Sequence, residues 1–206
     1  MKYLTILIHG LEGSSKDWEE INGFSKGGNL TQSLKARGLD YRAYDLYGHG
    51  EWDAEEEDFD PSSISDDLYP KFVYRSADKI AQNIRAELGR GEYDGINLVS
   101  YSGGSVPGMK ILKKLTNLRI GHIILCVPTP EKEYDDEFSL HNNLDVFDGR
   151  DVIVFMGTED EEVPPEDMDF FFKQLHCRNK TLYRYPCGHA LPVNWTKTAA
   201  EILEFD

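Results

Sequence analysis

The sequence has little cysteine, and its cysteines do not fall into a recognisable pattern. Cys126, Cys177 and Cys187 are widely spaced, and no two of them have the CxxC spacing of metal or redox sites. An odd number of scattered thiols is typical of a reducing compartment. We expect free thiols, with a Cys177–Cys187 bridge as the less favoured alternative.

Basic residues and long apolar runs are also scarce. The chain has 22 Lys and Arg against 37 Asp and Glu, a formal net charge of −15, which argues against a nucleic-acid or anionic-membrane partner. No apolar run approaches the roughly 20 residues that a membrane span requires. The apolar residues 3–9 lack a signal-peptide cleavage site, so we expect a buried first strand and a cytoplasmic protein.

Apolar runs of strand length alternate with helical patterns along the 206 residues, which predicts one domain spanning 1–206. The expected strands are 3–9, 41–45, 96–101, 122–127, 151–156 and 181–185, and the expected helices are 28–37, 76–88, 105–115, 165–175 and 194–203. This alternation predicts a doubly wound α/β fold, with a mostly parallel sheet flanked by helices on both faces.

Two segments interrupt the alternation. Residues 51–67 are strongly acidic and indicate an exposed loop, whereas residues 128–149 are a mixed polar stretch that we interpret as a short flap or lid-like insertion. Both follow expected strands. Ligands of open α/β sheets bind beyond the carboxyl ends of the strands, so we expect both segments to border that crevice.

The stretch LVSYSGGS at residues 98–105 joins an expected strand to an expected helix. A tight turn of this kind needs small residues two positions on either side of its tip, and Ser100 and Gly104 place Ser102 there. Such a turn directs the N–H of Gly103 and the positive end of the next helix at one space. The turn therefore marks Ser102 as a candidate nucleophile, although a plain glycine-rich connection remains an alternative.

Three other stretches lie where a serine nucleophile needs partners. The turn after the first strand, HGLEGSSKDW, can direct the N–H of Leu11 at an oxyanion together with that of Gly103. Asp160 follows the strand 151–156 and is one of four adjacent acids, so its position alone does not single it out. His189 lies on a loop after the last strand, from which it can reach across the crevice as a general base.

Together these stretches resemble the α/β-hydrolase superfamily over nearly the whole chain. The matching motifs are the His-Gly after the first strand, DLYGHG at 45–50, the turn 100–104, Gly157-x-x-Asp160-x-x-Val163-Pro164 and Gly188-His189, in the superfamily's order of Ser, Asp, His. The resemblance implies Ser102 as nucleophile, His189 as base and Asp160 as the acid that orients it. It also implies Leu11 and Gly103 as oxyanion donors and a structural His49, and we expect neither cofactor nor metal.

The sequence departs from the superfamily's pattern at two positions of the turn, with Ser100 in place of glycine and Gly103 in place of a larger residue. Some relatives place the acid one strand earlier, which makes Asp135 the alternative acid. A serine nucleophile implies acyl transfer, and residues 128–149 are too short for a full cap. We therefore expect a carboxylesterase for small or accessible acyl groups, with a thioesterase, a peptidase or a non-catalytic ligand-binding protein as alternatives.

Overall fold

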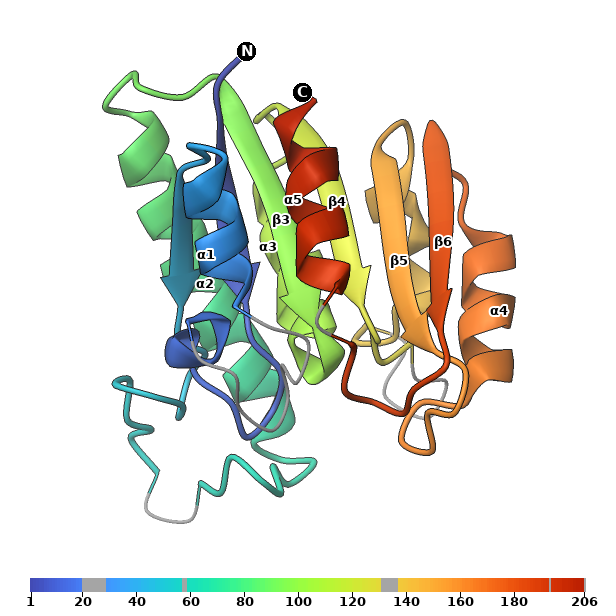
Figure 1. Cartoon of the computed structure of the whole chain (residues 1–206). Coiled ribbons are helices and arrows are strands. Elements are labelled where there is room, and N and C mark those ends of the chain that lie inside the picture. The colour runs from blue at the N-terminus through green and yellow to red at the C-terminus, as the bar shows by residue number, and fades with distance from the viewer. Residues whose placement is uncertain (20–28, 57–58, 131–136, 193, 206) are drawn as a thin grey trace.

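A six-stranded parallel sheet forms the centre of the molecule in the computed structural model (Figure 1), which describes residues 1–19, 29–56, 59–130, 137–192 and 194–205. Its strand order is β2-β1-β3-β4-β5-β6. Each expected strand is present, with ends within two residues of those expected. The strands are β1 (Tyr3–Ile8), β2 (Tyr41–Tyr44), β3 (Gly95–Tyr101), β4 (Ile120–Cys126), β5 (Asp151–Gly157) and β6 (Asn179–Tyr185).

Helices cover both faces of this sheet, which confirms the doubly wound fold. The helices α1 (Leu30–Ala36) and α5 (Trp195–Glu204) pack on one face, and α2 (Tyr69–Leu88), α3 (Ser105–Lys114) and α4 (Pro165–Gln174) pack on the other (Figure 1). Side chains alternate along the buried strands to supply two cores. In β1, for example, Leu7 faces α1 and α5, whereas Ile6 and Ile8 face α2 and α3.

The helix α2 is longer than the sequence pattern predicts, because it begins at Tyr69 rather than near residue 76. Pro70 lies in its first turn, where the missing N–H of proline costs no helical hydrogen bond. Phe72 and Val73 are fully buried and extend the apolar face that Ile80 and Ile84 continue. The expected helix was therefore correct in type and in its end, and wrong at its start.

The expected insertion at 128–149 is described on either side of residues 131–136, and the alternative acid Asp135 lies outside the described residues. Its second part contains the short helix η3 (His141–Phe147), whose Phe147 is buried in the core. Lys110 of α3 pairs with Glu137 at 3.1 Å, and Lys113 donates to Asn143 at 2.5 Å. This part is therefore fixed against α3, and a flap over the site stays a prediction.

All three cysteines are free thiols, as expected, and the alternative Cys177–Cys187 bridge is not formed. Among the described residues, no helix is both long and apolar enough to cross a lipid bilayer. Since the six strands are parallel, the loops that leave their carboxyl ends meet at one edge of the sheet, where the candidate site lies.

Candidate active site

Ser102 lies at the tip of a strained turn between β3 and α3. Its backbone has a φ of 46°, a left-handed conformation that is uncommon for any residue other than glycine. The turn continues as one short helical turn, Ser102–Gly104, before α3 begins at Ser105. The strained conformation turns the Ser102 side chain out of the sheet at the carboxyl end of β3, in line with the expected elbow.

His189 reaches Ser102 from the loop after β6. Its Nε2 lies 2.8 Å from the Ser102 Oγ, and only 8% of its side chain is exposed. Tyr101 fixes this loop, because its hydroxyl donates to the carbonyl oxygen of His189 at 2.7 Å and its ring meets the imidazole edge-on. Sequence reasoning missed this role, because Tyr101 has the pattern of an ordinary strand residue.

Asp160 holds the other side of the imidazole. Its Oδ2 lies 2.9 Å from the Nδ1 of His189, and its Oδ1 accepts the N–H groups of Glu162 and Val163 at 3.0 Å each. Burial acts to raise the pKa of Asp160, but the hydrogen bonds from His189 and these N–H groups outweigh it and hold the pKa below its usual value. A carboxylate can only accept, so Nδ1 carries the proton and Nε2 is left to accept from Ser102.

Main-chain hydrogen bonds join the Asp160 loop to the His189 loop. The N–H of Thr158 donates to the carbonyl oxygen of Tyr185 at 2.8 Å, and that of Glu159 donates to Cys187 at 2.9 Å. Gly157 lies where the two loops come closest to each other, and a Cβ there would overlap the carbonyl oxygens of Cys187 and Gly188. We call this contact between residues 157–159 and 185–188 the acid–histidine seam. It holds the loops of Asp160 and His189 together mainly through main-chain groups, and the Thr158 hydroxyl adds one hydrogen bond to the Tyr185 carbonyl oxygen at 3.2 Å.

Leu11 packs directly over Gly103. A Cβ on Gly103 would lie 2.6 Å from the Leu11 Cγ and 3.0 Å from its Cδ1, so the leucine occupies the space of the missing side chain. This contact brings the two expected oxyanion donors together beside Ser102. It also explains the departure from the superfamily's pattern at Gly103, because a larger residue there would displace Leu11.

The turn that carries Leu11 is held by side chains. His9 bridges it: its Nδ1–H donates to the carbonyl oxygen of Gly10 at 2.6 Å, and its Nε2 accepts the N–H of Leu46 at 3.0 Å. The ring is 1% exposed, and burial lowers the pKa of His9 to about 4, so the imidazole is neutral at pH 7. Ser14 and Asp17 form the expected capping box at the start of the short helix η1 (Ser15–Trp18).

Asp45 is a second anchor of this turn, and the sequence reading did not single it out. Its Oδ1 accepts the N–H of Ser15 at 2.6 Å, and its Oδ2 accepts that of Glu51 at 3.0 Å. Burial acts to raise the pKa of Asp45, and these backbone hydrogen bonds more than reverse it, so the pKa lies below its usual value. The signal was available in the DLYGHG motif, but the motif does not reveal a partner 30 residues earlier in the chain.

His49 of the same motif has partners other than Ser102, Asp160 and His189, which we call the triad. It is 3% exposed, its Nδ1 bonds the carbonyl oxygen of Tyr47 at 2.9 Å, and its ring packs against Phe59 and Phe72. This agrees with a structural role. Among the described residues, no group of three or more His, Cys, Asp or Glu side chains is placed to hold a metal ion.

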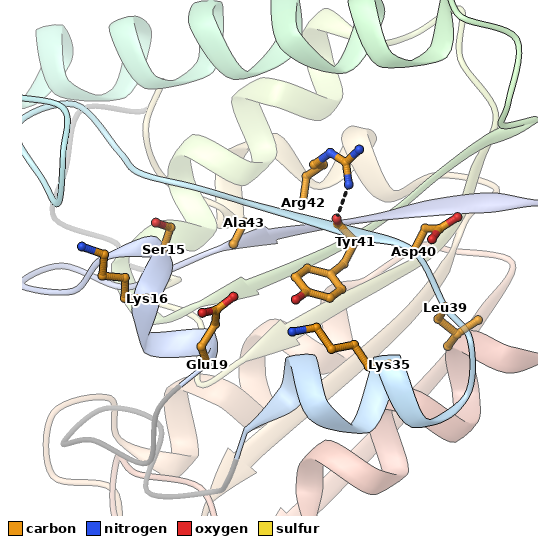
Figure 2. Close-up of a pocket in the computed structure, with 9 residues that line it drawn as sticks. All are labelled: Ser15, Lys16, Glu19, Lys35, Leu39, Asp40, Tyr41, Arg42 and Ala43. Carbon is orange, nitrogen blue, oxygen red and sulfur yellow. Dashed lines mark hydrogen bonds between the residues drawn. The ribbon is translucent and has the colours of Figure 1, made fainter.

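A hollow of about 520 Å³ lies away from the triad, between η1, α1 and β2 (Figure 2). The residues that line it include no member of the triad. Arg42 donates to the carbonyl oxygen of Tyr41 at 2.9 Å and pairs with Glu87, and Asp40 pairs with Lys2 at 2.9 Å. These charges are directed at their neighbours and not at a common point, so we assign the hollow no part in the chemistry.

Solved structures with the same fold include esterases and a lipase. Est1E from Butyrivibrio proteoclasticus, solved with ferulic acid bound, has a TM-score of 0.68 at 18% identity, covering 98% of this chain and 86% of that one. A monoacylglycerol lipase from Paleococcus ferrophilus has a TM-score of 0.68 at 16% identity, covering 98% and 92%. A cold-adapted esterase from an Arctic intertidal metagenomic library has a TM-score of 0.66 at 19% identity, covering 99% and 82%. No protein-family model and no curated sequence matches the chain.

Proposed function

We propose that this chain, which has the α/β-hydrolase fold, is a serine hydrolase that cleaves carboxylic esters through an acyl-enzyme intermediate. The observation that carries the proposal is the continuous hydrogen-bonded path from Asp160 through His189 to Ser102. The fixed tautomer of His189 supports it, because Nε2 is free to take the serine proton. The esterases and the lipase among the similar structures support an ester as the substrate.

The proposed reaction begins when the Ser102 Oγ attacks the ester carbonyl carbon and His189 Nε2 takes its proton. The carbonyl oxygen becomes an oxyanion, which accepts from the N–H groups of Leu11 and Gly103. The tetrahedral intermediate then collapses as Nε2 returns the proton to the departing alcohol. A water molecule, deprotonated by the same Nε2, releases the acid from the acyl-enzyme and restores Ser102. Asp160 stabilises the imidazolium in both halves.

Labelling with a fluorophosphonate probe tests the nucleophile, with Ser100→Ala as a matched control. Ser100 lies two residues away in the same turn and is fully buried, and its Oγ has no hydrogen-bond partner among the described residues. We expect wild type and Ser100→Ala to label equally, and Ser102→Ala not to label. Hydrolysis of p-nitrophenyl acetate should fall by about 10⁴-fold or more in Ser102→Ala. Equal labelling of Ser102→Ala and wild type would overturn the proposal.

A further inference from the structure

Two carboxylates lie beside the His189 imidazole. Asp160 is at Nδ1, and Glu162 is near Nε2, the nitrogen that faces Ser102. We propose that Glu162 makes the enzyme prefer esters whose departing alcohol carries a positive charge. This inference rests on the proposed function, because it assigns a role to a residue next to the proposed general base. It concerns the choice of substrate, and Glu162 takes no part in the proton transfers.

The backbone of Glu162 is tied to Asp160, and its carboxylate lies beside His189. Its Oε2 lies 3.7 Å from the Nε2 of His189, which is too far for a hydrogen bond, whereas the Ser102 Oγ lies 2.8 Å from the same nitrogen. Glu162 therefore does not displace the serine. Its backbone N–H donates to Asp160 at 3.0 Å, which ties its main chain to the triad. The side chain is 67% exposed, so it lies on the open side of the site.

The charge of Glu162 is not balanced by a basic residue. Among the described residues, no Lys or Arg forms an ion pair with it. By contrast, two acids of the loop beyond β2 are paired: Glu51 with Lys16, and Glu55 with Lys71 and Arg75. Glu162 is therefore an unneutralised negative charge at the mouth of the site.

The mechanism decides which part of a substrate Glu162 meets. Nε2 must come within hydrogen-bond distance of the departing oxygen in order to protonate it. A group 3.7 Å from Nε2 on the exposed side consequently lies near the departing alcohol. An ammonium group two carbons from the departing oxygen can approach the Glu162 carboxylate to about 4–5 Å. The attraction of two such charges in water corresponds to about a fivefold gain in rate.

Two methylphosphonothioate esters test this preference by their rates of reaction with Ser102. One has 2-(trimethylammonio)ethanethiol as leaving group, and the other has its neutral isostere 3,3-dimethylbutanethiol. In each, a P–O bond to the Ser102 Oγ forms as the P–S bond breaks, and the serine proton passes through His189 to the leaving thiolate. Mass spectrometry of the Ser102 peptide gives both rates, whether or not the enzyme turns over a given carboxylic ester.

We expect the cationic ester to label wild type about five times faster than the neutral one at low ionic strength. The ratio should fall to about one in Glu162→Gln, and in wild type in 1 M NaCl. Glu161→Gln is the matched control: it removes the same charge from the neighbouring exposed residue, which forms no ion pair with His189, and should keep the wild-type ratio.

Three results would overturn the inference: a wild-type ratio of one, an unchanged ratio in Glu162→Gln, or failure of the cationic ester to label a chain that fluorophosphonate labels. A chain that none of the three reagents labels at Ser102 fails the proposed function itself. The two failures are therefore distinguishable.

Discussion

The two sides of the triad are held in place by different means. On one side, the acid–histidine seam relies on main-chain hydrogen bonds and on the absence of a side chain at Gly157. On the other side, the turn that carries Leu11 relies on the side chains of His9 and Asp45. The main-chain hydrogen bonds of the seam do not depend on a titratable side chain, whereas the turn depends on two, whose pKa values lie below their usual range.

Because of this difference, we expect substitutions in the seam to affect the site at every pH, and the turn to respond to pH as well. A substitution in the seam acts through steric overlap and moves His189 relative to Asp160 at every pH. A change at His9 or Asp45 acts through hydrogen bonds that depend on protonation, and we expect it to move the N–H of Leu11 relative to Ser102. The four changes below test this division, beginning with the largest expected effect.

Asp160→Asn removes the negative charge beside the His189 imidazole while keeping the shape of the side chain. The Asn Oδ1 can still accept the N–H groups of Glu162 and Val163, so we expect the loop to stay in place. Its amide N–H₂ faces Nδ1 of His189, which forces the wrong tautomer and should lower kcat by about 10⁴-fold. Steady-state hydrolysis of p-nitrophenyl acetate measures the loss, and an unchanged thermal melting curve serves as the control for folding. More than a tenth of wild-type activity would contradict the assignment of Asp160.

Gly157→Ala tests the seam itself. The added methyl group overlaps two carbonyl oxygens of the His189 loop and should force the loops apart by about 1 Å, which costs about 100-fold in kcat. Gly188→Ala is the control from the other side of the seam, because a Cβ there lies 3.5 Å from the nearest oxygen, an ordinary contact. Similar losses in the two variants would show that the seam does not depend on the close approach at Gly157.

Gly103→Ala tests the packing of Leu11. Its methyl group would displace the leucine side chain and with it the N–H of Leu11, so we expect kcat to fall about tenfold. Shortening the leucine makes room, and the double variant Gly103→Ala/Leu11→Ala should recover most of the loss. A double-mutant cycle measures this coupling. Strictly additive effects of the two substitutions would mean that the contact does not position the turn.

The pH dependence of stability tests the role of His9. Between pH 6.5 and about 4, the unfolded chain binds a proton at His9 that the folded chain excludes, so the free energy of unfolding falls as the pH falls. The slope from this residue is up to about 1.4 kcal/mol per pH unit. Urea unfolding of wild type and His9→Gln at pH 7.5, 6 and 5 measures it. The gap between the two proteins should narrow towards low pH, and a constant gap would rule out this role.

Sequence reasoning found the parts of this molecule whose signal is local. Strands rich in Ile, Val and Leu, small residues around Ser102 and the loop position of His189 each show in a short stretch. The contacts that fix the site are long-range: the N–H of Glu159 meets Cys187, and Asp45 reaches back to Ser15. A main-chain hydrogen bond leaves no mark on residue type, so the seam could not be read from the sequence.

Asp160 shows what a local sequence motif can reveal about the site and what it cannot. It is one of four consecutive acids, Glu159 to Glu162, and residue type alone does not show which of them is buried. The structure separates them by burial, because the Asp160 side chain is 2% exposed and that of Glu162 is 67% exposed. The spacing of the Gly157-x-x-Asp160 motif distinguished the buried acid from its neighbours. It did not indicate that Glu162 lies beside His189 as well.

The strand order also determines when during synthesis the candidate site can assemble. Every strand pairing is parallel, and β1 lies between β2 and β3. Tyr3 can therefore pair with Gly95 only after the chain has been made as far as β3. Sheets with such long-range pairings fold slowly. The triad residues leave the ribosome in the order Ser102, Asp160, His189. His189 comes after β6, which is the last strand in the sequence. A partly made chain therefore contains Ser102 without His189, and the hydrogen-bonded path from Asp160 to Ser102 can form only after β6 has been made.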